Sequence, residues 1–246
     1  MKNVNFIEKL KGMLFWQNWH PEVALRYLPV IAEIKKLGHH PSVLDVGSGG
    51  LGIAPYLGYK VTGIDIRFRP PFHYNLEKIK ASAVKIPFAD KVFDAVIAVD
   101  AFEHLIIPDR EKAVKEMLRC ARKVAIVAVP CGKPAYLQDK KLSKLYKKKF
   151  GKKYHFFEEQ LRLGIPEEKD IITAIVSAAK SLNIKLDLTI KGNESLKLRE
   201  FLMKGWMTKN FLLEIFFRKI LILFLPIFTF MNNPPVYRKI FIMNKK

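Results

Sequence analysis

Val43-Leu44-Asp45-Val46-Gly47-Ser48-Gly49-Gly50-Leu51-Gly52 is the stretch that decides the fold of this chain. Its first four residues are mostly β-branched or apolar and predict a short buried strand. The glycines that follow match the pattern G-x-G-x-x-G, in which residues without a Cβ let the backbone approach a ligand closely. The stretch therefore predicts a strand, a ligand-binding turn and a short helix in that order.

Strands and helices are predicted to alternate beyond this stretch. Apolar runs that are hydrophobic on both faces are typical of a parallel sheet covered by helices on each side. The expected strands are 42–46, 61–65, 79–84, 93–99, 124–129, 184–190 and 236–243, and the main expected helices are 23–37, 109–120 and 166–182. We therefore expect an α/β fold: a Rossmann-like seven-stranded, mostly parallel sheet with helices on both faces and an apolar helical insertion before the last strand.

The length of 246 residues suits one α/β domain, and half of the residues are hydrophobic, enough for a large core. The two cysteines are too few for a disulfide framework. We expect a single domain over 1–246. Its parts are an N-terminal helical segment (1–40), a cofactor-binding half (41–132), a lysine-rich loop (133–165) and an apolar insertion (196–232).

The glycine turn alone fits both a dinucleotide and a methyl-donating nucleoside. Asp65 ends the second expected strand, where a carboxylate suits the ribose diol of either ligand. Asp45, two residues before the turn, would repel a pyrophosphate but could orient the ammonium group of a methionyl moiety. A nicotinamide dinucleotide stays the alternative ligand.

Four motifs occur in the order that one family uses. They are Val43-Leu44-Asp45-Val46-Gly47-Ser48-Gly49, Val61-Thr62-Gly63-Ile64-Asp65, Ile86-Pro87-Phe88-Ala89-Asp90 and Phe93-Asp94-Ala95-Val96-Ile97. Together they resemble class I S-adenosylmethionine-dependent methyltransferases, and most of all the subgroup called methyltransferase type 11. The resemblance covers about residues 40 to 130 and implies S-adenosyl-L-methionine as the cofactor.

The resemblance also implies a role for each residue that matches a motif. It assigns the methionyl end to Asp45, Gly47, Ser48 and Gly49, the ribose to Asp65, the adenine to Ile66, the adenine edge to Ser82 and Ala83, and the sulfonium to Val99 and Asp100. Many relatives carry an acid at the adenine-edge position, whereas this chain has Ser82. A hydroxyl also accepts a hydrogen bond, so the expected site keeps that function.

The acceptor of the methyl group needs a base only if it is a hydroxyl or a protonated amine. His104 and His155 are the candidate catalytic residues, and the other side chains that could take a proton are Asp100, Glu103 and Tyr136. A structural role for His104 is an equal alternative. No His, Cys or Asp cluster has metal-ligand spacing, so we predict no metal site.

The formal net charge of +20 favours an anionic partner or surface. Lysines crowd the segment 133–153, in which Asp139 is the only acid. The segment 201–231 is rich in aromatic and aliphatic residues, but Glu214, Arg218 and Lys219 interrupt it, and the uncharged remainder is shorter than the ~20 residues of a spanning helix. The segment is expected to form a lid, an interfacial helix or a buried helix.

Three functions remain open on the sequence. The first is methylation of a small-molecule, glycan or lipid-linked acceptor, with peripheral contact to an anionic membrane through 201–231. The second is RNA methylation, with the lysines on phosphates, although no separate RNA-binding module is evident. The third is a non-catalytic protein with a methyltransferase fold. The N-terminus has no signal-peptide pattern, so the cytoplasm is the expected location, with or without membrane contact.

Overall fold

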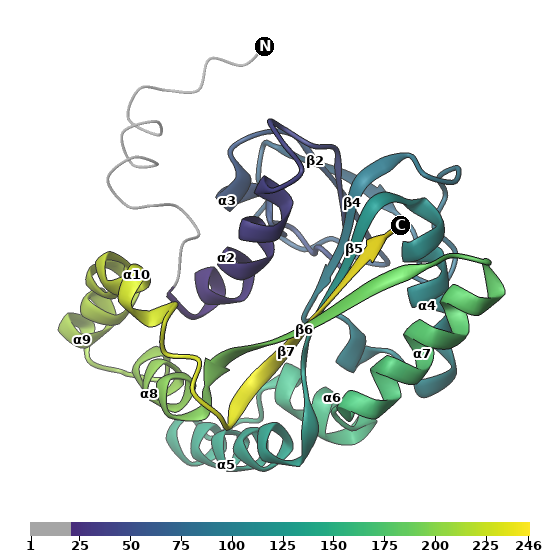
Figure 1. Ribbon diagram of the computed structural model, residues 1–246. Helices are drawn as coiled ribbons and strands as arrows, with labels where there is room; N and C mark the ends of the chain where they lie inside the picture. Colours follow the sequence, from purple (N-terminus) through teal and green to yellow (C-terminus); the bar gives the residue numbers. More distant parts are fainter. Residues whose placement is uncertain (1–20) are drawn as a thin grey trace.

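The computed structural model describes residues 21–246 and is built around one seven-stranded sheet (Figure 1). The strand order is β3-β2-β1-β4-β5-β7-β6. The strands are β1 (Val43–Val46), β2 (Val61–Asp65), β3 (Leu76–Lys80), β4 (Phe93–Val99), β5 (Ala121–Pro130), β6 (Leu186–Ser195) and β7 (Val236–Lys245). β7 runs antiparallel to both of its neighbours, and every other pairing is parallel. The predicted mostly parallel sheet is confirmed.

Helices cover both faces of the sheet, as the two-sided apolar strands predicted (Figure 1). On one face, α2 (Pro21–Lys35) and α3 (Ala54–Leu57) pack on a core that includes Val43, Ile97 and Ile126. On the other face, α4 (Ile107–Cys120) and α7 (Glu168–Ser181) pack on a second core. Successive residues of a strand point to opposite faces, so the inner strands contribute to both cores, whereas the edge strand β6 contributes Leu186, Leu188 and Ile190 to one of them.

The strand order places a ligand crevice between β1 and β4. From β1 the chain moves outward through β2 to β3, and it then returns to the other side of β1 as β4. At such a reversal the loops after the two strands diverge, which leaves a crevice at the carboxyl ends of the strands. The glycine turn follows β1 and Asp100 follows β4, so both lie at this crevice.

The expected lysine-rich loop over 133–165 is wrong. The structure has α5 (Gly132–Phe150) and α6 (His155–Leu163) in that segment. Lysine is a good helix former, and the buried residues of α5 recur at helical spacing beneath its lysines: Ala135, Gln138, Asp139, Leu142 and Ser143. Because lysines outnumber the side chains that this helix buries, its amphipathic pattern was not recognised in the sequence.

The third strand begins earlier than predicted. The apolar run around Ile79 suggested 79–84, whereas β3 is Leu76–Lys80 and lies at the sheet edge with Lys78 and Lys80 exposed. The backbone then turns at Ser82, whose carbonyl accepts a hydrogen bond from Lys85 N at 3.1 Å. The charged side chains of this edge strand interrupt its apolar pattern, so the start of the strand could not be recognised in the sequence.

The apolar insertion lies between β6 and β7, as predicted. It forms α8 (Leu196–Trp206), α9 (Phe211–Ile215), a π-helical turn (Phe216–Ile220), a 3₁₀ turn (Leu221–Phe224) and α10 (Leu225–Phe228). Leu221, Ile222 and Leu225 are buried against α2 and α8, but much of the segment is exposed. No helix within residues 21–246 has the length and apolar character needed to cross a membrane.

Candidate active site

The glycine turn after β1 is held against β2. Gly47 has φ +77° and donates its N–H to Ile64 O at 2.8 Å. A Cβ at position 47 would lie 2.6 Å from the Cβ of Ala101, so only glycine allows this close approach of the turn to the segment after β4. The turn therefore brings the loops after β1 and β4 together at the crevice.

Asp65, at the end of β2, fixes the same turn from the opposite side. Its Oδ2 accepts the N–H of Gly49 at 2.9 Å, and its Oδ1 accepts the N–H of Arg67 at 2.9 Å. Each carboxylate oxygen has a second lone pair, so both can also accept a ligand hydroxyl. The carboxylate is half-buried at the rim of the crevice.

Asp45 lies behind the turn and does not line the crevice. It is 1% exposed, and its Oδ2 accepts the N–H of Ile53 at 2.8 Å, at the start of α3. Burial, and to a smaller extent the charge of Asp65, raises the pKa of Asp45 to about 7. The structure thus gives Asp45 a position from which it holds the turn, in place of the direct ligand contact that the resemblance implied.

The raised pKa of Asp45 predicts a pH-dependent stability. Above about pH 4 the unfolded state loses this proton, while the folded state keeps it until about pH 7, so the free energy of unfolding falls as the pH rises between these values. The free energy of unfolding of the wild type should fall by about 4 kcal/mol across this range, and Asp45→Asn should abolish this fall. Urea unfolding of both proteins at pH 4.5 and pH 8 measures the difference. Parallel pH profiles would contradict the assignment.

The crevice is a cavity of about 710 Å³. Its walls come from the glycine turn, the loop after β2, the segment after β3, the segment after β4 and parts of α2 and α6. The residues assigned to the cofactor that line it are Gly47, Ser48, Gly49, Asp65, Ile66, Ser82, Ala83, Val99 and Asp100. The structure therefore brings all of them except Asp45 to one place, although they come from four separate parts of the chain.

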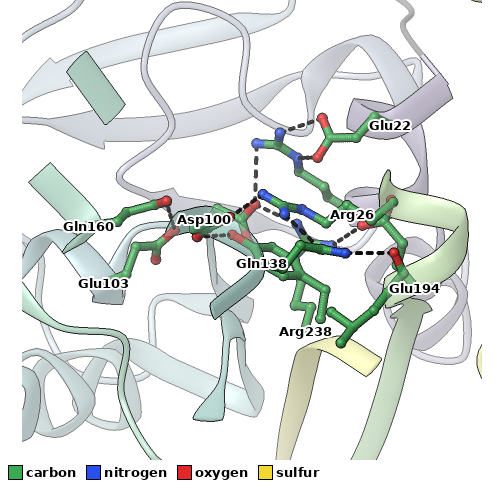
Figure 2. A network of polar contacts seen from close by, with 12 residues as sticks. Glu22, Arg26, Asp100, Glu103, Gln138, Gln160, Glu194 and Arg238 are labelled. Carbon is green, nitrogen blue, oxygen red and sulfur yellow. Dashed lines mark hydrogen bonds and ion pairs between the residues drawn. The ribbon is translucent and has the colours of Figure 1, made fainter. Parts of the chain in front are cut away.

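Asp100 lies at the centre of a largely buried network of charges (Figure 2). Its two carboxylate oxygens accept from Nε and Nη2 of Arg238 at 2.6 and 2.7 Å, and Arg26 Nη1 lies 3.2 Å from Oδ2. On α2, Glu22 Oε1 accepts a hydrogen bond from Arg26 Nε at 2.9 Å. Glu194 Oε2 lies 3.3 Å from Arg238 Nη1. The network ties α2, β6 and β7 to the end of β4.

The arginines determine which acids of the network are ionised. Burial opposes the charge of Asp100, but Arg238 and Arg26 hold its pKa below the usual range. Burial raises the pKa of Glu194 to about 7, and the charge of Glu22 adds to that shift. Burial and then the charge of Asp100 raise the pKa of Glu103 to about 8. At neutral pH Asp100 is a carboxylate, whereas Glu103 keeps its proton.

A second cavity of about 420 Å³ adjoins the first. The two share Arg26, Asp100, His104 and Phe156 as walls. The second cavity is also lined by Glu103 and Gln160 and by an aromatic wall of Tyr154, Phe156, Phe157, Trp206 and Tyr237. The arrangement suits two ligands that meet at Asp100 and His104.

The candidate bases lie at different distances from this junction. His104 lines both cavities, and its Nδ1 lies 3.0 Å from Glu159 Oε2 without the alignment of a hydrogen bond. His155 lines only the first cavity and is exposed. Tyr136 lines neither. In the part of the chain that the structure describes, no three metal-ligating side chains gather to hold an ion.

The motifs did not indicate Arg26 and Arg238. Arg26 lines both cavities, whereas Arg238 lines neither and acts through Asp100. Arg238 is 0% exposed in the apolar strand β7, and a charged residue in such a strand is a signal of a buried partner. Arg26 follows Glu22 by one helical turn. Both arginines meet Asp100 only after folding, so the sequence could show their presence but not their partner.

Comparison with known proteins agrees with the fold. Residues 44–129 match the family model described as Methyltransferase domain. The PH0226 protein of Pyrococcus horikoshii OT3 is similar over 99% of this chain and 100% of its own, with 15% identity and a TM-score of 0.53. A geranyl diphosphate C-methyltransferase of Streptomyces coelicolor A3(2) is similar over 89% of this chain and 79% of its own, with 13% identity and a TM-score of 0.49.

The fold and the family model define the class of the protein. Residues 44–129 match a methyltransferase domain and the sheet has the Rossmann-like fold of that class, which confirms the resemblance drawn from the motifs. The protein is a methyltransferase, and S-adenosyl-L-methionine is its cofactor.

The first cavity fits this cofactor. A volume of about 710 Å³ lies in the range of drug-sized ligand sites, about 300–1,000 Å³. The backbone of the glycine turn faces the cavity without a Cβ at Gly47, and two carboxylates, Asp65 and Asp100, line it. The free lone pairs of Asp65 suit a ribose diol, whereas Asp100 is already paired with Arg238 and Arg26.

Proposed function

We propose that this methyltransferase acts on a small-molecule or lipid-linked acceptor that it meets at an anionic membrane surface. The observation that supports the acceptor class best is the exposed apolar surface of residues 211–231. Phe211, Leu212 and Leu223 are each more than two-thirds exposed, and Phe230 is 84% exposed. Apolar side chains at such density outside the core favour contact with lipid over contact with water.

Basic residues beside this surface complement an anionic headgroup layer. The last two turns of α5 and the residues after it carry Lys147, Lys148, Lys149, Lys152 and Lys153. Lys209, two residues before α9, has its Nζ 5.4 Å from the ring centroid of Phe150. This contact puts the basic end of α5 next to the start of the apolar surface. Each lysine near an anionic surface contributes about 1 kcal/mol of attraction.

The cofactor residues are proposed from the cavity walls. Asp65 accepts the ribose hydroxyls, while the backbone of Gly47, Ser48 and Gly49 faces the methionyl end. Arg26 lines the same cavity, but Glu22 and Asp100 already pair with its guanidinium. Asp45 acts through the turn that it holds.

The remaining assignments follow the walls farther from the turn. Ile66 and Ala83 flank the adenine, with Ser82 at its edge, and Val99 and Asp100 lie under the sulfonium. The cofactor supplies an electrophilic methyl group, so the protein has mainly to align the acceptor and to exclude water. Asp100 helps to align the acceptor because Arg238 fixes both of its carboxylate oxygens.

Flotation with phosphatidylcholine vesicles that contain phosphatidylserine tests the membrane contact. The wild-type protein should float, and the triple variant Leu212→Glu/Leu223→Glu/Phe230→Glu should bind at least tenfold more weakly, because each buried side chain contributes about 1.5–3 kcal/mol. Val176→Glu on α7 is the control, since Val176 is 59% exposed but lies outside this surface.

RNA methylation is the alternative that the same experiment examines. A gel shift with RNA across a salt series should show at most weak binding that falls steeply with salt. Flotation lost in the triple variant but kept in the control supports the proposal. Tight RNA binding, together with vesicle binding equal in all three proteins, would overturn it.

A further inference from the structure

We propose that the second cavity binds a neutral aromatic acceptor with a phenol-type hydroxyl, and that Glu103 takes the proton from this hydroxyl during methyl transfer. The proposal rests on the proposed function, because it names the acceptor of the same reaction. The cavity adjoins the cofactor cavity at Asp100 and His104, so an acceptor in it lies next to the methyl donor.

The walls of the cavity favour a flat ring. Tyr154 has its ring centroid 5.5 Å from Phe157 and 5.1 Å from Trp206, and Phe156 lies 5.6 Å from Tyr154. Aromatic rings at these distances pack edge to face or in offset stacks, and a further ring in the cavity would extend the same packing. A volume of about 420 Å³ holds one or two fused rings with a short substituent.

Glu103 supplies an unused acid at the buried end of the cavity. Its side chain is 0% exposed and lines the cavity, and its Oε1 accepts from Gln160 Nε2 at 3.2 Å. Its Oε2 is buried and has no hydrogen-bond partner in the described residues. A buried carboxyl oxygen without a partner is costly, and a ligand hydroxyl would satisfy it.

The other charged side chains that line the cavity have partners, and among the atoms of Arg26 and Arg199 only Arg199 Nε is buried without one in the described residues. Arg26 lies between Glu22 and Asp100, and Arg199 binds Asp139 at 2.8 Å. A carboxylate on the acceptor would have to separate one of these pairs or meet Arg199 Nε alone, which is costly in a buried site. A neutral hydroxyl needs only the free oxygen of Glu103.

The protein groups around Glu103 give it a high affinity for a proton. Burial raises its pKa to about 8, and Asp100 adds to the shift, while Arg238 and Arg26 oppose it. From the remaining elements it faces Gln160 on α6, His104 on its own turn and, at longer range, Arg110 on α4. Glu103 is therefore ionised above about pH 8 and can then accept a proton from a phenol, whose pKa is about 10.

The step balances in atoms and charge. The acceptor oxygen forms a bond to the methyl carbon as the carbon–sulfur bond breaks and leaves its electron pair on sulfur, and the hydroxyl proton passes to Oε2 of Glu103. His104 is a less suitable base because both of its ring nitrogens face carboxylates of the protein. Nδ1 lies 3.0 Å from Glu159 Oε2, and Nε2 lies 4.0 Å from Glu103 Oε1.

Calorimetry with the protein loaded with S-adenosylhomocysteine tests the proposal without the natural acceptor. The probes are 2-naphthol, a neutral hydroxyl, and 2-naphthoate, an anion of similar shape. We expect 2-naphthol to bind at least about tenfold more tightly than 2-naphthoate at pH 8.5. Its affinity should rise about three- to tenfold from pH 6.5 to pH 8.5, because the ionised Glu103 accepts the stronger hydrogen bond.

Four variants separate Glu103 from its surroundings. Glu103→Gln keeps the shape of the side chain and should remove the rise with pH, whereas His104→Gln should keep it. Tyr154→Leu should weaken the binding of 2-naphthol about fivefold and leave its pH profile intact. Glu111→Gln, an exposed acid on α4, is the control and should behave as the wild type.

The results also separate this inference from the proposed function. Binding of S-adenosylhomocysteine to each variant shows that the methyl-donor site is folded. If that binding is intact but 2-naphthol does not bind, or the rise with pH persists in Glu103→Gln, the acceptor inference is overturned and the methyltransferase stands. Failure of the wild-type protein to bind S-adenosylhomocysteine would instead count against the proposed cofactor site.

Discussion

Replacing Arg238 with methionine is expected to lower the free energy of unfolding by about 3–5 kcal/mol. Arg238 is 0% exposed and donates two hydrogen bonds to Asp100. Methionine fills a similar volume but removes the charge that allows Asp100 to remain ionised in a buried position. Glu194 loses the same partner. The penalty comes from these unpaired acids more than from the lost contacts themselves.

Urea denaturation of a matched set measures this effect. The double variant Arg238→Met/Asp100→Asn should recover part of the loss, because the neutral amide needs no counter-charge. Arg122→Met, a half-exposed arginine that pairs with Asp94, is the control and should change the free energy by about 1 kcal/mol or less. An Arg238→Met protein as stable as the wild type would show that Asp100 is not held by this pair.

Asp65→Ala is expected to weaken the binding of S-adenosylmethionine about 10- to 100-fold. Hydrogen bonds to a charged group contribute about 1.5–3 kcal/mol, and each 1.4 kcal/mol is about tenfold in affinity. The substitution removes the acceptor of the ribose hydroxyls and also the acceptor of Gly49 N–H, so it loosens the turn as well. Calorimetry at a fixed pH and salt concentration measures the change.

Two further variants separate these contributions. Asp65→Asn keeps one acceptor oxygen and should fall between the wild type and Asp65→Ala. Asp90→Ala removes a carboxylate that is 70% exposed and pairs with Arg119 outside the cavity, so it should bind the cofactor as the wild type does. Equal affinities in all four proteins would remove Asp65 from the site.

The parts of the site that depend on the local chain were predictable from the sequence. The strand at Val43–Val46, the glycine turn and Asp65 follow from residues close together in the chain, because a tight turn between a strand and a helix leaves few alternatives to glycine. The spacing of motifs added Ser82 and Val99 to the same cavity. The residue types of the turn and the order of the family motifs were together sufficient to predict these residues.

The parts that depend on tertiary contacts were not predictable in the same way. Asp45 was expected to face the ligand because of its charge, but its position is fixed by the N–H of Ile53 at the start of α3. The pairing of Arg238 with Asp100 joins residues 138 positions apart and requires the observed strand order. The helix α5 was missed because its lysines outnumber the few side chains that it buries.

The crevice between β1 and β4 is proposed to bind a sulfonium nucleoside and not a dinucleotide. The most direct measurement is a calorimetric titration of the wild-type protein with S-adenosylmethionine and, separately, with NAD⁺. We predict one saturable site for S-adenosylmethionine and binding of NAD⁺ at least about 100-fold weaker, because residues 44–129 match a methyltransferase domain, whose cofactor is S-adenosylmethionine. Equal or tighter binding of NAD⁺ would contradict the account.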